Sequence, residues 1–182
     1  MTHHLQQEID TFRQLIKQTP DFPLPGILFE DIFPIFTSPR HHESLIRAYE
    51  LQILALGVQP DIIVGLDARG FLLGPTLALR ANCSFVPVRK AGKLPGRLHT
   101  VSYAKEYGVD EFAVQEGAIP KGAKVVVVDD LIATGGSAAA AEELVVKAGG
   151  VVVGFVFIIE LVGLNGRNRL TAPVHSLIQS QA

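Results

Sequence analysis

Four short runs of apolar, mostly β-branched residues alternate with helical segments, and this alternation does most to limit the fold. The apolar runs lie at 61–66, 84–88, 124–130 and 151–160. Segments with helical periodicity lie at about 2–18, 43–56, 71–80 and 138–148. Strands that are apolar throughout are typical of a parallel sheet covered on both faces by helices. The sequence therefore predicts an α/β fold with an open, mostly parallel sheet flanked by helices, and a ligand beyond the carboxyl ends of the strands.

Size and composition favour one domain over 1–182. A chain of 182 residues buries about 70% of its unfolded surface on folding and needs no disulfide or metal to hold it. The net charge of -2 gives no basic excess for general attraction to nucleic acid, so no nucleic-acid partner is expected. The hydrophobic share of 48% and mean hydropathy of +0.31 indicate apolar surface buried between subunits.

The sequence also bears on location. Cys83 is the only cysteine, which excludes an intrachain disulfide and agrees with a reducing compartment. The N-terminal residues have no apolar core of the kind that a secretion signal needs. The longest strongly apolar stretch, 151–159, is shorter than the ~20 residues that span a bilayer. We therefore expect a cytoplasmic protein with no membrane partner.

The most informative segment is Val125–Ser137. Four consecutive valines predict a buried central strand, and the adjacent carboxylates of Asp129 and Asp130 follow at its carboxyl end. Gly135 and Gly136 then allow a tight turn that brings backbone N–H groups close to a ligand.

This loop and the helix after it are suited to an anion. Thr134 and Ser137 add hydroxyl groups, and Ser137 is a suitable N-cap for a helix over 138–148. A phosphate at such a helix start meets unpaired N–H groups and the positive end of the helix dipole. The alternative is an ordinary strand–loop–helix joint with a capping serine. The two aspartates argue against it, because paired carboxylates repel one another unless a cation or hydroxyl-bearing ligand is present. A sugar phosphate fits best.

The segment Gly65–Gly70 presents a second anion site at the end of another strand. Arg69 stands there at a predicted helix start, where a cation opposes the helix dipole unless an anion is bound. An arginine with nearby free N–H groups is suited to a pyrophosphate.

A basic run, Arg89–Arg97, follows the second strand. On its own it would be a solvated positive loop. Beside two other anion sites, contact with a pyrophosphate is the favoured role, chiefly for Arg89 and then for Lys93.

Two further segments suggest parts that cover the site. The stretch 93–112 is punctuated by glycine and proline and contains two tyrosines, so we interpret it as a mobile lid loop that excludes water; the alternative is a surface hairpin. At the N-terminus, 1–38 is expected to form a helix and a hood. Phe29 in this hood could stack on a planar base or could equally be a core residue.

Taken in order, these motifs resemble the adenine phosphoribosyltransferases, a branch of the type I phosphoribosyltransferase family. The segment Val125–Ser137 is similar to the motif by which that family binds phosphoribosyl pyrophosphate (PRPP), and the likeness runs from about Phe22 to Val162. Several motifs are specific to the adenine branch. These are Phe-Pro-Leu-Pro-Gly at 22–26, Arg-Lys-Ala-Gly-Lys-Leu-Pro at 89–95 and Glu-Tyr-Gly at 106–108.

The resemblance implies a reaction: transfer of the 5-phosphoribosyl group from PRPP to adenine, giving AMP and pyrophosphate. It implies Mg²⁺ bound with PRPP and no metal held directly by the protein, and it implies a homodimer.

The resemblance also implies roles for particular residues. Ala133, Thr134, Gly135, Gly136 and Ser137 would bind the 5′-phosphate, and Asp129 and Asp130 the ribose hydroxyls. Asp67, Ala68, Arg69, Arg89 and Lys93 would face the pyrophosphate, with a strained peptide expected at Asp67–Ala68. Leu28, Phe29 and Glu30 would line the adenine pocket, the first and last through their backbone. Glu106 and Arg69 would be catalytic, Glu106 in proton transfer, and Tyr107 would help to close the lid.

One position departs from the pattern, and three other functions stay open. Relatives often carry arginine where this chain has Glu30, so the choice of base rests on whether that contact is made by backbone.

The alternatives are transfer to hypoxanthine, guanine or xanthine, a PRPP-binding regulator, and a sugar-phosphate binding module. The histidine pairs at 3–4 and 41–42 are interpreted as surface residues and not as a metal site.

Overall fold

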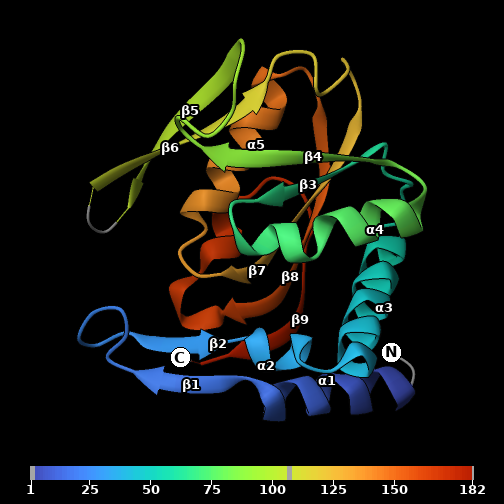
Figure 1. The fold of residues 1–182 in the computed structure, drawn as a ribbon, viewed down its shortest axis with the longest axis vertical. Coiled ribbons are helices and arrows are strands. Elements are labelled where there is room, and N and C mark those ends of the chain that lie inside the picture. Colours follow the sequence, from blue (N-terminus) through green and yellow to red (C-terminus); the bar gives the residue numbers. More distant parts are fainter. Residues whose placement is uncertain (1–2, 106–107, 182) are drawn as a thin grey trace.

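A seven-stranded sheet forms the centre of the computed structural model, which describes residues 3–105 and 108–181. The strand order is β5-β6-β4-β3-β7-β8-β9, and a separate two-stranded sheet, β1-β2, lies near the C-terminus (Figure 1). Five neighbouring strands are parallel: β3 (Ile62–Leu66), β4 (Ser84–Lys90), β7 (Lys124–Ile132), β8 (Val151–Leu161) and β9 (Val174–Ser180). The predicted open, mostly parallel sheet is confirmed.

Strand register brings the loops of the predicted site to one edge of the sheet. Ile62 at the start of β3 pairs with Ser84 at the start of β4 and with Val125 near the start of β7. Since these strands run side by side in the same direction, their carboxyl ends lie together. The loops that carry the two predicted anion sites therefore begin at neighbouring points.

Helices cover both faces of the sheet, as the uniformly apolar strands require. On one face lie α1 (His3–Leu15), α3 (Pro39–Ala55) and α4 (Gly74–Ala81), and on the other lies α5 (Gly136–Lys147). Along β7, Val126 and Val128 pack into the first core, whereas Val125 and Val127 pack into the second, because alternate strand residues point to opposite faces. All four valines are fully buried.

The boundaries of two predicted helices differ from expectation. The segment 71–80 is divided into a short 3₁₀ turn, Arg69–Leu72, and helix α4, with Leu73 between them. The first helix ends at Leu15 and is followed by β1 (Lys17–Pro20), which pairs with β2 (Leu28–Asp31). These two strands and α2 (Phe33–Phe36) form the N-terminal hood.

Most of the predicted lid loop is regular structure. Strands β5 (Leu98–Lys105) and β6 (Gly108–Gln115) form an antiparallel hairpin, and β6 continues the main sheet by pairing with the end of β4. The segment is thus closer to the hairpin alternative than to an irregular loop. A role as a lid stays a prediction.

The remaining elements complete the C-terminal part of the chain. Two 3₁₀ turns, Val162–Leu164 and Gly166–Arg169, connect β8 to β9. Among the described residues, no helix is long and apolar enough to cross a membrane. His42, interpreted from the sequence as a surface residue, is half-buried: its ring packs against Phe36 with centroids 4.9 Å apart, and its Nε2 is buried.

Candidate active site

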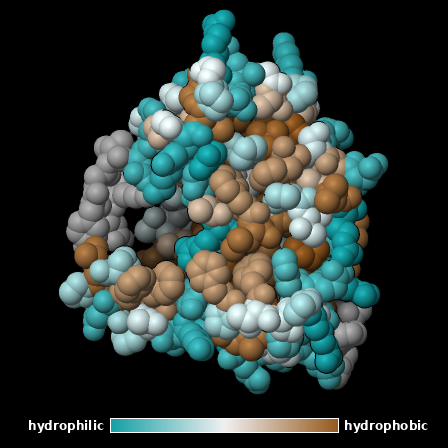
Figure 2. Space-filling model, in the orientation of Figure 1, coloured by the Kyte–Doolittle hydropathy of each residue, from teal (hydrophilic) through white to brown (hydrophobic). Residues whose placement is uncertain are grey.

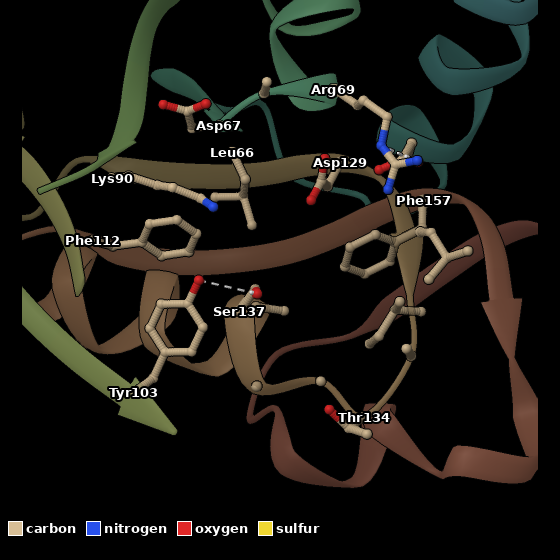
Figure 3. Close-up of a pocket in the computed structure, with 18 residues that line it drawn as sticks. Leu66, Asp67, Arg69, Lys90, Tyr103, Phe112, Asp129, Thr134, Ser137 and Phe157 are labelled. Atoms are coloured by element: carbon tan, nitrogen blue, oxygen red, sulfur yellow. Dashed lines mark hydrogen bonds and ion pairs between the residues drawn. The ribbon is translucent and has the colours of Figure 1, made fainter. Parts of the chain in front are cut away.

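A cavity of about 290 Å³ opens at the carboxyl ends of β3, β4 and β7 (Figure 3). In the space-filling view the molecule is hollowed between the hood and the main sheet (Figure 2). The lining combines acidic, basic, hydroxyl-bearing and backbone groups. It consists of Leu66, Asp67, Ala68, Arg69, Lys90, Tyr103, Phe112, Asp129, Asp130, Leu131, Ile132, Ala133, Thr134, Gly135, Gly136, Ser137, Ala138 and Phe157.

The loop Ala133–Gly135 joins β7 to α5 and forms one wall of the cavity. Gly135 is the N-cap of α5 and has a φ of 77°, in the left-handed region that favours glycine. A Cβ at Gly135 would also lie 2.3 Å from the carbonyl oxygen of Gly166. Two independent constraints therefore call for glycine here. The first residues of α5, whose N–H groups have no partner within the helix, line the cavity.

Ser137 does not have the capping role expected of it. The helix starts at Gly136, so Ser137 lies in its first turn, and its Oγ donates to the Tyr103 hydroxyl at 3.4 Å. The hydroxyl still borders the cavity, as Figure 3 shows.

The paired carboxylates both border the cavity, on its floor. Asp130 is buried, and Arg69 Nε lies 2.9 Å from its Oδ2. Within residues 3–105 and 108–181, that buried oxygen accepts no aligned hydrogen bond. Asp129 projects into the cavity (Figure 3), and its carbonyl accepts a hydrogen bond of 2.7 Å from the buried Tyr49 hydroxyl.

Burial sets the charge state of this pair. Removal from water and then the neighbouring Asp130 raise the pKa of Asp129 well above its ordinary value. Burial also raises the pKa of Asp130, although Arg69 acts in the opposite direction. The unliganded site thus disfavours two full negative charges, and hydroxyl donors or a cation brought by a ligand would relieve the cost.

Arg69 connects the two acids to the hood. Besides its ion pair with Asp130, its guanidinium lies 5.7 Å from the centre of the Phe29 ring. The preceding Asp67–Ala68 peptide bond is cis, at the position where an unusual peptide was expected. Gly70 allows this loop to approach β7, because a Cβ there would lie 2.7 Å from the carbonyl oxygen of Val128.

The basic run begins in the last two residues of β4, and its side chains are divided between the cavity and other surroundings. Lys90 lines the cavity, with Nζ 3.5 Å from Asp110. Arg89, the foremost candidate from the sequence, is not among the lining residues: its Nε donates to Asp67 Oδ2 at 3.3 Å and its NH1 to the Lys93 carbonyl at 3.1 Å. Lys93 is exposed and also outside the lining. The period of two along β4 could have indicated Lys90, which alternates in step with the buried Val86 and Val88.

Leu28, Phe29 and Glu30, expected to line the adenine pocket, are not among the residues that line the main cavity. Phe29 packs edge to face against Phe22, with centroids 5.1 Å apart. The buried Glu30 carboxylate accepts hydrogen bonds from Gln18 Nε2 at 3.2 Å and Ser180 Oγ at 2.8 Å. It borders a separate cavity beside Arg13 and does not line the main one. The carboxylate at this departing position therefore has hydrogen-bond donors in β1 and β9, and Leu28 and Glu30 both lie in β2.

The hairpin contributes residues that the sequence did not single out. Tyr103 from β5 and Phe112 from β6 line the cavity and pack on one another with centroids 4.8 Å apart (Figure 3). The tyrosine had been noted only as part of a lid. The predicted catalytic Glu106 and Tyr107 lie outside the described residues.

The cavity also bears on metal binding. Within the described residues, no group of three or more histidine, cysteine, aspartate or glutamate side chains could hold a metal ion. Two adjacent carboxylates beside a phosphate loop do fit a Mg²⁺ ion that arrives with a phosphorylated ligand, since Mg²⁺ is usually bound by one or two carboxylates together with substrate phosphates.

Comparison with known proteins identifies the family. Residues 39–174 match the family model described as phosphoribosyl transferase domain. The adenine phosphoribosyltransferase of Candida albicans is 53% identical over 167 residues, which cover 91% of this chain and 87% of the relative.

Solved structures agree with this. That of adenine phosphoribosyltransferase from Saccharomyces cerevisiae, in complex with D-2,5-dideoxy-2,5-imino-altritol 1,6-bisphosphate and adenine, is 50% identical, with a TM-score of 0.91 over 94% of this chain and 99% of that one. The enzyme from Trypanosoma brucei, in complex with AMP, pyrophosphate and ribose-5-phosphate, is 28% identical, with a TM-score of 0.87 over 96% of this chain and 80% of that one. The chain belongs to the adenine phosphoribosyltransferases of the phosphoribosyl transferase family.

Proposed function

We propose that this protein transfers the 5-phosphoribosyl group of PRPP to adenine, giving AMP and pyrophosphate. The observation that carries the proposal is the cavity at the carboxyl end of β7, where a phosphate loop, two adjacent carboxylates and Arg69 border one space. The Saccharomyces relative holds a bisphosphate and adenine, and the Trypanosoma relative holds both products and a sugar phosphate. These ligands are of the chemical kinds that such a cavity can bind.

Each wall of the cavity suits one part of the substrates. The N–H groups at the start of α5, with the hydroxyls of Thr134 and Ser137, would hold the 5′-phosphate. Asp129 and Asp130 would accept hydrogen bonds from the ribose hydroxyls, which removes the cost of their buried charge. Arg69, Lys90 and the Asp67–Ala68 loop would face the pyrophosphate. Arg89 and Lys93 would support that loop, because Arg89 bridges Asp67 and the Lys93 carbonyl.

Adenine would bind between the hood and the main sheet. Phe29 offers a ring face, and the backbone of Leu28 and Glu30 offers hydrogen-bonding groups along β2. Because Arg69 lies over Phe29 and pairs with Asp130, it stands between the base and the ribose.

The proposed chemistry is mainly electrostatic. When pyrophosphate leaves the anomeric carbon, positive charge develops on the ribose and a base nitrogen attacks from the opposite face. Arg69 and Lys90 would stabilise the charge of the leaving group, and the paired carboxylates would stabilise the ribose through its hydroxyls. Mg²⁺, carried by PRPP and held beside Asp129 and Asp130, would add further neutralisation of the pyrophosphate charge. Positioning of base and sugar within one enclosed space supplies much of the remaining acceleration.

The direct test is transfer with a panel of bases. Purified protein is mixed with Mg²⁺ and PRPP, and adenine, hypoxanthine, guanine, xanthine and orotate are offered separately while nucleotide and pyrophosphate are measured. We expect activity on adenine alone. Glu30→Gln should keep the same preference, because its carboxylate accepts hydrogen bonds from Gln18 and Ser180 and does not line the cavity. Activity on another base would overturn the base assignment, and PRPP binding without transfer would indicate a regulator or binding module.

Replacing Asp129 with asparagine should raise the free energy of unfolding at high pH and lower the activity. A carboxyl with a raised folded pKa contributes stability that is present below its unfolded pKa and is lost as the pH rises through the folded pKa. Asp129→Asn carries no such charge, so we expect it to exceed the wild type in free energy of unfolding by about 1 kcal/mol near pH 8 and to lose this advantage near pH 4. Its kcat/KM should fall roughly 10- to 100-fold, as for the loss of one charge-assisted hydrogen bond.

Urea denaturation at a series of pH values measures the difference in stability. The matched control is Asp10→Asn, on the exposed face of α1 far from the cavity. An Asp129→Asn protein that is less stable than the wild type at every pH would contradict the interpretation.

We propose that Glu106, the candidate that the sequence resemblance gives, transfers a proton on the base. Glu106→Gln should then lower kcat by about 100-fold, the lower range for loss of a general acid or base. Glu111→Gln, in β6, is the matched control and should change kcat little. If Glu106→Gln left kcat unchanged, the hairpin would act only by covering the site.

The protein is also proposed to form a homodimer. Figure 2 shows apolar side chains gathered on the face that carries α4, where Leu79 is 83% exposed. Leu54, at the end of α3, is 69% exposed. A second copy could cover such surface. Sedimentation should give about twice 19.6 kDa for the wild type and a shift toward the monomer for Leu79→Asp. A monomeric wild type at micromolar concentration would overturn the proposal.

A cytoplasmic location is proposed with the activity. The free Cys83 thiol and the fold without a membrane-spanning helix among the described residues agree with it. Cell fractionation tests it, and recovery in a secreted or membrane fraction would contradict it.

A further inference from the structure

The connection between β8 and β9 lies directly behind the phosphate loop. Gly166, in this connection, is buried and touches the loop along its backbone. A Cβ added at Gly166 would lie 2.2 Å from the carbonyl oxygen of Ala133, 2.7 Å from the nitrogen of Gly135 and 2.9 Å from the carbonyl carbon of Thr134. A Cβ at Gly135 would in turn meet three backbone atoms of Gly166 within 3.0 Å. The two backbones are therefore in contact, and neither loop can move toward the other.

An ion pair between the exposed side chain of Arg167 and the buried carboxylate of Glu160 holds the next residue. Arg167 donates from Nε to Glu160 Oε1 at 2.5 Å and from NH2 to Glu160 Oε2 at 2.6 Å, a bidentate pair of the kind that gives the most directional hold. Glu160 is 3% exposed and also accepts a hydrogen bond of 2.8 Å from Ser176 Oγ. The hydrogen bonds from Arg167, with a smaller contribution from Ser176, hold the pKa of Glu160 below its ordinary value, so the pair is ionised at neutral pH.

The ion pair lies beside the residue at which the phosphate loop begins. Glu160 is one residue from the end of β8, and its partner across the sheet is Ile132, the last residue of β7. Ala133, where the phosphate loop starts, follows Ile132 directly. Arg167 itself does not line the cavity, so it reaches the loop only through the backbone of its neighbour Gly166.

The other end of the connection is tied to α5. Glu142, a buried residue of that helix, accepts hydrogen bonds from Thr171 N at 3.2 Å and Thr171 Oγ1 at 2.6 Å. The connection is thus attached both to the strand before the phosphate loop and to the helix after it. This arrangement sets the position of the loop from outside the cavity.

We propose that Arg167 is a positioning residue for the 5′-phosphate: its ion pair with Glu160 holds Gly166 against the loop Ala133–Gly135 and thereby fixes the loop in its binding conformation. The proposal rests on the proposed function in assigning this loop to the 5′-phosphate of PRPP. It predicts that loss of the ion pair weakens ligands that carry a 5′-phosphate and spares ligands that do not.

The test compares Arg167→Met with Arg169→Met. Arg169 lies two residues further on and is exposed. Initial rates are measured with PRPP and adenine varied separately. For Arg167→Met we expect KM for PRPP to rise by about tenfold or more, as for a small displacement of a binding group, and KM for adenine to change less than about twofold. Arg169→Met should resemble the wild type. Equal changes in both KM values, or none, would overturn the proposal.

A second variant covers the risk that Arg167→Met fails to fold because it leaves Glu160 charged, buried and unpaired. The double variant Glu160→Gln/Arg167→Met removes both charges and should show the same selective rise in KM for PRPP. Arg167→Lys, which keeps the charge but loses the bidentate geometry, should lie between the wild type and Arg167→Met.

A pair of glycine variants tests the backbone contact itself. Gly166→Ala would place a methyl group against the phosphate loop, whereas a Cβ at Gly163 meets no atom within 4 Å. Gly166→Ala should therefore raise KM for PRPP, and Gly163→Ala should not. Equal behaviour of the two variants would contradict the contact.

Direct binding separates this inference from the proposed function. Calorimetric titration with ribose 5-phosphate and with pyrophosphate needs no transfer reaction. We expect Arg167→Met to bind ribose 5-phosphate about tenfold more weakly than the wild type and pyrophosphate unchanged. Equal binding of ribose 5-phosphate by variant and wild type would overturn only the role of Arg167. A wild type that does not bind ribose 5-phosphate would overturn the assignment of the phosphate loop on which both proposals depend.

Discussion

Two adjacent carboxylates at the end of β7, the half-buried Asp129 and the buried Asp130, are the constraint around which the site is built. Burial and mutual repulsion raise the pKa of Asp129, and Arg69 compensates Asp130 only in part. A protein gains no stability from such a pair in the absence of a ligand. The surrounding structure holds it in place: Tyr49 hydrogen-bonds to the Asp129 carbonyl, and Gly70 lets the Arg69 loop lie against the strand. The two carboxylates lower the stability of the unliganded protein. A ligand with several hydroxyl groups, together with a cation, would remove this cost when it binds.

The central sheet could be predicted from the sequence because its signal is local. Uniformly apolar runs of five to ten residues must be covered on both faces, and β3, β4, β7 and β8 appear where these runs lie. The β5–β6 hairpin could not be predicted in the same way, because its residues gain their strand structure from pairing with each other and with the end of β4. Strand β9 was missed for a similar reason: its hydrogen bonds go to β8, and its own sequence, Val-His-Ser-Leu-Ile-Gln-Ser, is only half apolar.

In the candidate site, too, the parts that are continuous in sequence could be predicted and the contacts between distant segments could not. The phosphate loop and the two aspartates are continuous in sequence, and the structure brings them to one cavity with Arg69. Contacts between distant segments were not foreseeable from local pattern. Glu30 pairs with Ser180, 150 positions away, and Gly166 supports Gly135 from the far side of β8. Lys90 and Tyr103 border the cavity because they lie on the face of their strands that is turned toward it. That face depends on the register of β4 and β5 against β6.

A crystal structure with PRPP, Mg²⁺ and an unreactive adenine analogue would test the central claim most directly. The account predicts the 5′-phosphate at the start of α5, the ribose hydroxyls within hydrogen-bonding distance of Asp129 and Asp130, and the base against Phe29, with the Glu30 carboxylate still bonded to Ser180. If the 5′-phosphate lay on Lys90 and Arg69 instead, or if the ribose made no contact with the two aspartates, the assignment of the cavity would be wrong.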